Sequence, residues 1–163
     1  LRLILDGRYD QVEYFGFGPG DSYIDRHNAS YRGLFTGKVV EQMTDYIRPQ
    51  ECGNHYATEW AAVLDADRKG LFFRQRKGFD FQALPYTAEE LDAARHNFSL
   101  PASDKTVVSL DYRQSGVGSN SCGPRLDEKY QLKEKDFTME LFLCPMDGKK
   151  DSFWDKAVVR YKK

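Results

Sequence analysis

Apolar residues recur along the chain in short runs with a period of two, and this pattern limits the fold more than any other feature. Near the start, Leu1, Leu3 and Leu5 alternate with other residues. In a strand, such alternation places successive side chains on opposite faces. Further strands are predicted at residues 12–15, 39–40, 46–47, 60–64, 71–73, 79–81, 107–110 and 139–143. The polar, glycine-containing segments 65–70 and 76–78 predict hairpin loops.

One short helix is predicted among these strands. Thr87 and Glu90 have the spacing of a capping box, in which each side chain caps the backbone of the other. Pro85 precedes the pair and Asn97 follows the apolar positions, so the helix is expected near residues 87–96. Many strands with one short helix predict an all-β fold, either a sandwich or a barrel.

Composition excludes several classes of protein. The 24 Lys and Arg residues are spread along the chain with 25 Asp and Glu, so no basic stripe is available for nucleic acid. No apolar run approaches the ~20 residues that span a bilayer. The three cysteines, Cys52, Cys122 and Cys144, are too few for a disulfide framework. Their odd number favours a reducing compartment, so a cytoplasmic location is expected.

The sequence contains no recognisable metal-binding or catalytic set. His27, His55 and His96 lie in separate segments, and none has a second ligand at the spacing of a zinc site. The glycine-rich segment 16–20 is interpreted as a rigid turn, because Pro19 removes a donor amide and no helix pattern follows. Acidic residues are so frequent near predicted strand ends that carboxylate pairs are expected by chance, and none is nominated.

The loop at residues 115–124 is unusual. It concentrates glycine and serine around Asn120, and would bring backbone amides and small hydroxyls close to a polar ligand such as a sugar. A long irregular turn that caps the sandwich explains the same composition equally well.

Ordered segments of the chain resemble the motifs of the β-galactosidase small-chain domain. Residues 12–26 resemble W/Y-x-G-x-G-P…N-Y-x-D-R, and residues 46–54 resemble Y-V-R-P-Q-E-N-G-N. Residues 79–91 match F-x-F-S-A-x-x-Y-x-x-x-x-L, and residues 116–124 resemble M-G-V-G-G-D-D-S-W-G-P. The resemblance is collinear from about residue 1 to residue 144.

This resemblance implies a family-2 glycoside hydrolase in which the region forms a galactose-mutarotase-like supersandwich, an antiparallel β-sandwich. Residues 1–146 would be the C-terminal portion of that sandwich domain, and residues 147–163 an extension for which an added strand is one option. In the family, the acid/base and nucleophile glutamates belong to a TIM barrel earlier in the chain. None of them maps here, so no catalytic residue is expected. If upstream strands are absent, the isolated chain is expected to expose an apolar face and self-associate.

The resemblance also implies one direct contact with substrate. In the family, the tryptophan of D-D-S-W lines the sugar pocket, and Cys122 takes that position here. A thiol lacks the flat apolar face of an indole, so either Tyr112 or Tyr130 substitutes or the specificity differs. The predicted substrate-binding residues are Ser119, Asn120, Ser121 and Cys122. The charged motif residues Asp25, Arg26, Arg48 and Glu51 are interpreted instead as a structural ion-pair and turn network.

The function expected from the resemblance is that of an accessory C-terminal domain of a retaining β-galactosidase, which cleaves terminal β-D-galactosyl residues. Its expected partners are galactosides, through the parent enzyme, and the catalytic TIM barrel of that enzyme, which is expected to be oligomeric. Neither cofactor nor metal is expected in this segment, and any Mg or Na would bind elsewhere in the parent. Two alternatives stay open. One is a stand-alone carbohydrate-binding module with Trp60 or Trp154 as its platform, and the other is a structural or oligomerisation domain.

Overall fold

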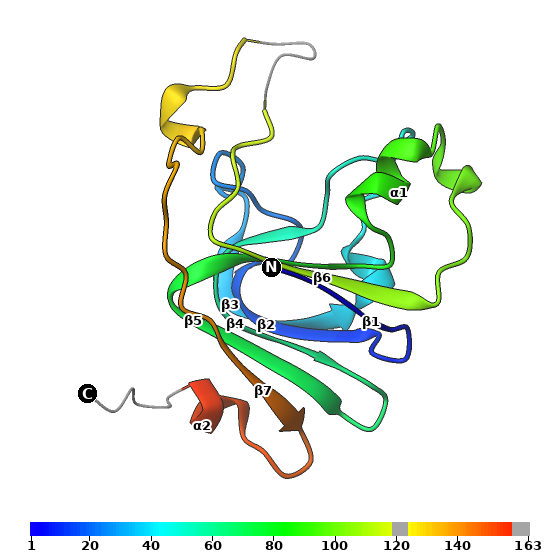
Figure 1. Cartoon of the computed structure of the whole chain (residues 1–163), viewed down its shortest axis with the longest axis vertical. Helices are drawn as coiled ribbons and strands as arrows, with labels where there is room; N and C mark the ends of the chain where they lie inside the picture. Colours follow the sequence, from blue (N-terminus) through cyan, green and yellow to red (C-terminus); the bar gives the residue numbers. More distant parts are fainter. Residues whose placement is uncertain (119–123, 158–163) are drawn as a thin grey trace.

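Seven strands pair into one antiparallel sheet in the computed structural model, which describes residues 1–118 and 124–157 (Figure 1). The sheet order is β1-β6-β5-β4-β2-β3, and β7 pairs with β5 outside this path. The strands are β1 (Arg2–Asp6), β2 (Gln11–Gly18), β3 (Tyr31–Lys38), β4 (Asn54–Leu64), β5 (Lys69–Leu84), β6 (Lys105–Asp111) and β7 (Phe142–Asp147). The expected all-β sandwich is therefore confirmed.

Strand β5 organises the sheet because its two ends have different partners. Its first half pairs with β7, from Lys69↔Asp147 to Arg74↔Phe142. Its second half pairs with β6, in a register that includes Leu84↔Val107. Strand β4 runs along the opposite edge of both halves. The sheet consequently divides along one edge of β5, and the two parts diverge in Figure 1.

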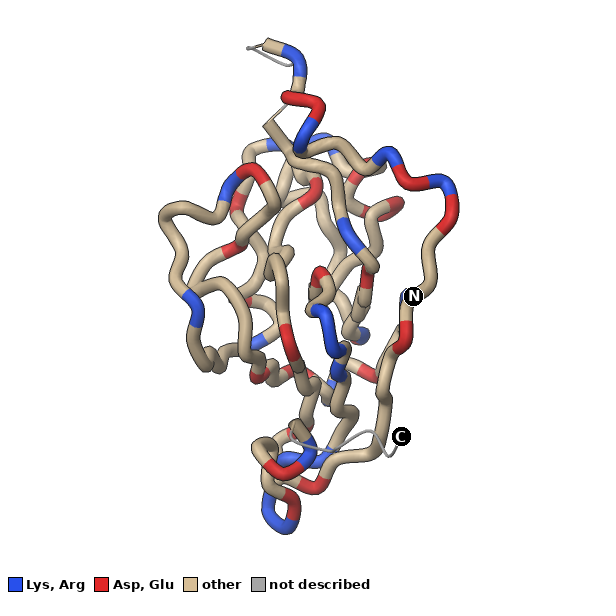
Figure 2. The backbone as a smooth tube through the Cα atoms, turned by 90° about the vertical axis from the view of Figure 1, so that its left-hand side faces the viewer, with Lys and Arg blue, Asp and Glu red and all other residues tan. Residues whose placement is uncertain are grey.

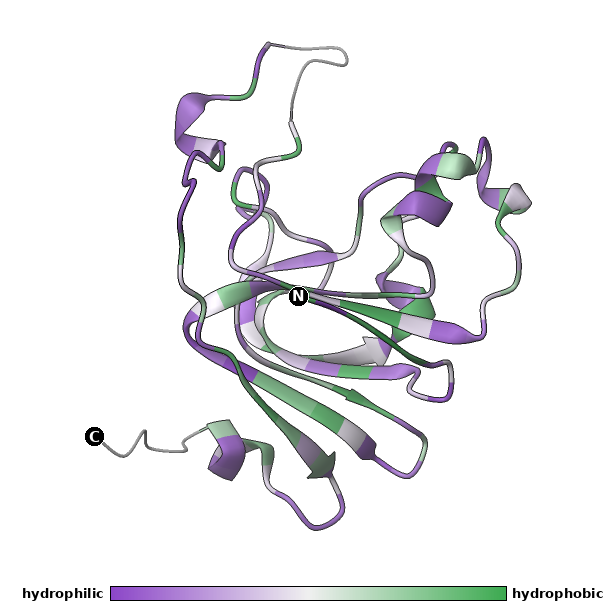
Figure 3. Cartoon of the chain, viewed as in Figure 1, coloured by the Kyte–Doolittle hydropathy of each residue, from purple (hydrophilic) through white to green (hydrophobic). Residues whose placement is uncertain are grey.

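Both faces of β4 are buried, which requires two separate cores. Trp60, Ala62 and Leu64 point to one face, and Ala61 and Val63 point to the other. All five side chains are at most 1% exposed. The apolar residues accordingly form a nearly continuous run on the strands, coloured green in Figure 3.

The curled sheet encloses the larger cluster, which we call core 1. Its buried side chains come from β2, β4, β5, β6 and the residue after β3, and partly buried residues of β1 pack against it. They are Val12, Tyr14, Val39, Ala61, Val63, Phe73, Phe79, Phe81, Ala83, Val108 and Leu110.

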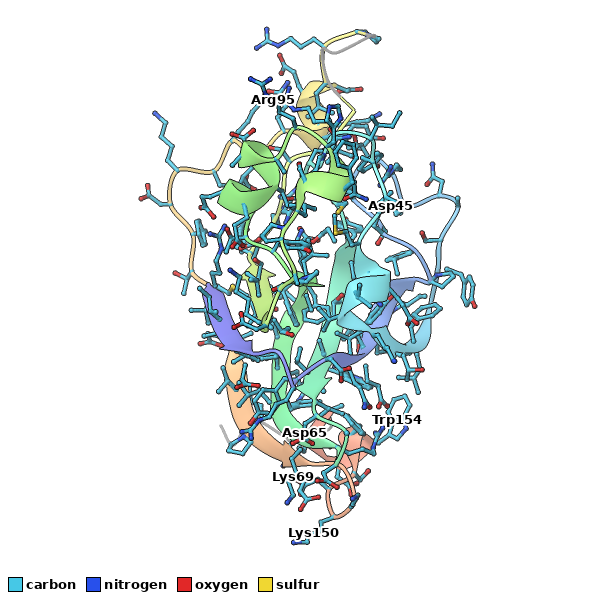
Figure 4. All side chains as sticks on the ribbon, turned by 90° about the vertical axis from the view of Figure 1, so that its right-hand side faces the viewer. Asp45, Asp65, Lys69, Arg95, Lys150 and Trp154 are labelled. Atoms are coloured by element: carbon cyan, nitrogen blue, oxygen red, sulfur yellow. The ribbon has the colours of Figure 1, made fainter. Side chains whose placement is uncertain are left out.

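A second cluster, core 2, lies on the outer face of β4 and β5. It contains Trp60, Ala62, Leu64, Phe72 and Met146. The C-terminal helix α2 (Phe153–Ala157) covers it. The ring of Phe153 stacks on Trp60 with the centroids 5.5 Å apart, and the half-exposed Trp154 meets the edge of Trp60 at 6.3 Å. In Figure 4, Trp154 lies at the same end of the molecule as Asp65 and Lys69.

Several strand predictions are wrong, each for a physical reason. Residues 39–40 belong to the 3₁₀ helix η1 (Val39–Gln42), where the Glu41 carboxylate accepts a hydrogen bond from the Lys38 amide. Residues 46–47 form no strand, and Ile47 is exposed. The predicted strand at 139–143 begins only at Phe142 and runs to Asp147. Met139 and Leu141 instead pack on core 1 without pairing.

The hairpin loop predicted at 76–78 is also wrong, because these residues lie inside β5. Between the pairs Arg74↔Trp60 and Phe79↔Thr58, residues 75–78 of β5 face only Glu59 of β4. Gly78 accommodates this irregularity with a φ of 80°. The glycine and the charged residues of this segment mark an irregularity in the pairing of one long strand. Sequence alone does not distinguish such an irregularity from a turn.

The capping-box prediction is confirmed, although the helix is shorter than expected. Helix α1 spans Ala88–Ala93, with Thr87 as its N-cap. The Glu90 amide donates to the Thr87 hydroxyl at 3.2 Å, and the Thr87 amide donates to the Glu90 carboxylate at 2.8 Å. The 3₁₀ helices η2 (Asn97–Ser99) and η3 (Glu128–Tyr130) complete the short helical elements. Within the described ranges, every helix is too short or too polar to cross a membrane.

Replacing Phe153 with alanine should uncover core 2. We expect the free energy of unfolding to fall by about 2 kcal/mol, because a partly buried ring and its stacking contact are lost. In a Trp154→Phe background, the emission of Trp60 should shift to longer wavelength. Urea unfolding followed by fluorescence measures both effects. Phe98→Ala is the control, because Phe98 is 88% exposed. If Phe153→Ala and Phe98→Ala gave the same free energy of unfolding and the same emission wavelength, the covering role of α2 would be contradicted.

Candidate functional site

The predicted substrate-binding residues Ser119, Asn120, Ser121 and Cys122 lie outside the described residues. The structure does describe the chain on either side of them. We call residues 112–118 the entry arm, which follows β6 and leads to Ser119. The contacts of this arm define the candidate site.

Asp25 holds the end of the entry arm. Its carboxylate accepts hydrogen bonds from two consecutive amides, Val117 N to Oδ1 at 3.1 Å and Gly118 N to Oδ2 at 2.9 Å. Hydrogen bonds from successive backbone amides to a charged carboxylate are stronger than those between neutral groups, so they hold the peptide firmly. The arm is therefore fixed at the residue directly before the predicted substrate loop.

Asp80 of β5 holds the other end of the entry arm. Its Oδ2 accepts from the Gln114 amide at 2.7 Å, and its Oδ1 accepts from Asn54 Nδ2 at 3.4 Å. The Asp80 residue is only 4% exposed. Burial raises the pKa of its carboxyl to about 6, against the opposing effect of the Gln114 and Asn54 donors. A buried carboxylate thus joins the arm to the centre of the sheet.

A buried polar cluster attaches the neighbouring loop to the start of β4. The Asn54 side chain donates to the Ser22 carbonyl at 2.9 Å, and the Ser22 amide donates to the Asn54 carbonyl at 2.7 Å. The Ser22 hydroxyl accepts from the Tyr56 amide at 3.0 Å. Because both Ser22 and Asn54 are fully buried, these bonds fix the base of the turn that presents Asp25.

The chain that returns after the predicted substrate loop contacts the entry arm. The Gly116 amide donates to the Tyr130 carbonyl at 2.9 Å, and the Leu132 amide donates to the Ser115 hydroxyl at 2.9 Å. The entry arm is consequently held from the turn of Asp25, from β5 and from the returning chain.

A hollow of about 520 Å³ opens beside the end of the entry arm. Its lining combines aromatic rings, charged groups and amides, a mixture that suits polar ligands such as sugars. The lining residues are Tyr23, Asp25, Arg26, Tyr46, Gln50, Glu51, Val117 and Gly118. The turn of Asp25 and the loop 46–51, which the motifs singled out separately, therefore meet at one place.

Two acidic residues of the hollow are already bound by protein groups. The Tyr23 hydroxyl donates to Glu51 Oε1 at 3.2 Å, and Gln82 Nε2 donates to the same oxygen at 2.7 Å. Although Glu51 is exposed as a residue, desolvation of its carboxyl raises its pKa. The Asp25 carboxylate is occupied by the amides of the entry arm.

Among the charged motif residues, Arg26 forms its ion pair with a residue outside that group. Arg26 pairs with Asp21 at 2.7 Å, and its guanidinium lies over the Tyr23 ring at 5.3 Å. Asp21 and Asp80 are anchors that the sequence analysis missed, and neither has a local pattern that distinguishes it from other acids. Arg48 forms no ion pair in residues 1–118 and 124–157.

The candidate aromatic residues are divided between the core and the surface. Tyr112 stacks on Phe137 with the centroids 4.7 Å apart, and Tyr130 meets the entry arm through its carbonyl. Trp60 is buried in core 2, so its use as a sugar platform is wrong, whereas Trp154 is 56% exposed. The rings that line the hollow are those of Tyr23 and Tyr46.

The described residues contain no group of three or more His, Cys, Asp or Glu side chains arranged to hold a metal ion. His55 is buried and stacks on Tyr14, with the ring centroids 3.9 Å apart. Burial lowers the pKa of His55 to about 4. Positive and negative residues are interspersed along the backbone in Figure 2, as their distribution in the sequence predicts.

Comparisons with known proteins agree on one family. A family model described as the β-galactosidase small chain matches residues 1–143. A β-galactosidase of Actinobacillus pleuropneumoniae is 39% identical over 143 residues, which is 88% of this chain. The β-galactosidases of Staphylococcus xylosus and Kluyveromyces lactis are 37% and 34% identical over 83% and 86% of it. The chain spans 14% of the length of each of these relatives.

The raised pKa of Asp80 gives a prediction about pH. Because the folded pKa of about 6 exceeds the ordinary value of 3.8, the folded chain binds more protons than the unfolded chain between these values. The contribution of Asp80 to the free energy of unfolding therefore rises as the pH falls through this window. From pH 7 to pH 4.5, the wild type should gain roughly 2 kcal/mol relative to Asp80→Asn. Urea unfolding at both pH values measures this difference, and parallel pH profiles would contradict it.

Proposed function

The chain belongs to the β-galactosidase small-chain family, and from this premise we propose that it is an accessory C-terminal region of a β-galactosidase. In this proposal it shapes the edge of the active site through the loop at residues 119–122. The catalytic carboxylates belong to another part of the enzyme.

The observation that carries this proposal is the anchored entry arm. Asp25 and Asp80 hold it at Val117, Gly118 and Gln114. The sandwich thus presents a fixed base directly before the loop whose family counterpart touches the sugar. Binding groups are commonly placed on loops that a rigid scaffold supports.

The occupied acids beside the hollow support an accessory role. A retaining glycosidase needs two carboxyl groups about 5–5.5 Å apart, one as nucleophile and one as acid and then base. Here the Asp25 carboxylate accepts hydrogen bonds from two backbone amides, and the Glu51 carboxylate accepts them from Tyr23 and Gln82. The Asp21 carboxylate forms an ion pair with Arg26. These groups are used to build the site and are poorly placed to attack a sugar.

The proposed reaction of the complete enzyme is hydrolysis of a terminal β-D-galactosyl bond in two displacements, through a covalent galactosyl-enzyme. The partners are the galactoside and the catalytic TIM barrel of the same enzyme, in a cytoplasmic oligomer. This segment contributes no cofactor site, and any Mg or Na is bound elsewhere in the enzyme.

Replacing Cys122 with tryptophan in the complete enzyme tests the role of the loop. An indole at this position adds a flat apolar face against a sugar ring, so KM or kcat for a β-galactoside should change by roughly threefold to tenfold. Cys122→Ser is the matched control, because it keeps the small side chain without adding a ring. Steady-state kinetics with a chromogenic β-galactoside measure the effect. Unchanged kinetics in both variants would remove the loop from the active site.

A further inference from the structure

We propose that Asp25 is a positioning residue that fixes the end of the entry arm, at Val117 and Gly118, as one wall of the hollow. This inference rests on the proposed function, because it assigns a task to Asp25 within the same site. Asp25 acts through the backbone of the entry arm and is not required to touch the substrate.

The contact between Asp25 and the arm defines an orientation as well as a position. Each carboxylate oxygen receives a different amide, from Val117 at 3.1 Å and from Gly118 at 2.9 Å. Two hydrogen bonds to consecutive peptides fix the planes of both peptides relative to one planar group. The direction of the backbone at Gly118, the last described residue of the entry arm, is therefore determined here.

The glycines of the arm make this close approach possible. A Cβ on Gly116 would lie 2.5 Å from Asp25 Cγ, and one on Gly118 would lie 3.1 Å from Asp25 Oδ2. Any side chain at position 116 would therefore push the arm away from the carboxylate. Glycine at these two positions leaves the space that the Asp25 carboxylate occupies.

The turn that presents Asp25 is held in place from several sides. Tyr23 and Arg26 exchange backbone hydrogen bonds at 3.0 and 2.9 Å, which leaves Ile24 and Asp25 at the tip of a tight turn. Tyr23 is 1% exposed, and His27 Nδ1 lies 3.0 Å from its carbonyl oxygen. Since the turn is fixed on the sandwich, the position of Asp25 is transmitted to the arm.

The distinguishing experiment compares Asp25→Ala with Asp25→Asn in the complete enzyme. Alanine removes both acceptors, whereas asparagine keeps the size and one carbonyl acceptor. We expect Asp25→Ala to raise KM for a chromogenic β-galactoside by about tenfold with kcat less affected, because displacing Val117 and Gly118 disturbs the wall of the hollow and weakens sugar binding. Asp25→Asn should give an intermediate KM, and the thermal midpoint of both variants should stay close to that of the wild type.

The matched control is Asp67→Ala. Asp67 is an exposed acid that pairs with Lys149 at 2.9 Å on the hairpin between β4 and β5. The labelled residues Asp65 and Lys69 of this hairpin lie at the opposite end of the molecule from Asp45 and Arg95 (Figure 4). The KM of the Asp67→Ala enzyme should equal that of the wild type. A wild-type KM in a folded Asp25→Ala enzyme would overturn the proposal.

One further variant, used together with Asp25→Asn, keeps the proposal testable if Asp25→Ala does not fold. Gly118→Ala and Asp25→Asn should both raise KM, and wild-type kinetics in both would overturn the proposal. Kinetics of Cys122→Trp on the same enzyme separate the two claims. If Cys122→Trp alters the kinetics while every Asp25 variant leaves them unchanged, the loop contributes to the site but the position of the entry arm that Asp25 holds does not. If none of these variants alters the kinetics, the proposed function of the loop fails as well.

Discussion

The rest of the structure depends on the burial of β4 and β5 on both faces. Trp60 and Phe72 point to core 2, while Ala61 and Phe73 point to core 1. A sheet that is apolar on both sides needs a cover on each. The curled sheet supplies one cover from its own strands, and β7 with helix α2 supplies the other. The central strand pair is therefore covered on both faces.

The same strand pair supports the polar end of the sheet. Asp80 projects from β5 and Asn54 begins β4, so the strand pair itself carries the groups that fasten the loops. The Asp80 carboxylate is costly to bury, as its raised pKa shows, and its hydrogen bonds to Gln114 and Asn54 offset that cost.

The sequence predicts the buried strands well because a run of apolar residues directly indicates that a strand is buried. The strands near residues 60–64 and 107–110 and the Thr87–Glu90 capping box are found in this way. Strand β3 is missed because this edge strand contains Gly33 and Gly37 and is only half buried. The anchors of the site are also missed, since Asp21 and Asp80 gain their roles from long-range contacts. The resemblance to a known family, unlike the periodicity, singles out the two loops of the site, and the structure shows that they meet.

The central claim is that this region assists a β-galactosidase without performing the chemistry. Its most direct test is the turnover of a chromogenic β-galactoside by this chain alone and by the complete enzyme, at equal molar concentration. We predict turnover by the complete enzyme only, because the carboxylates beside the hollow are occupied by amides, hydroxyls and a guanidinium. Turnover by the isolated chain that is lost on substitution of Glu51 or Asp25 would contradict the account and make these carboxylates catalytic.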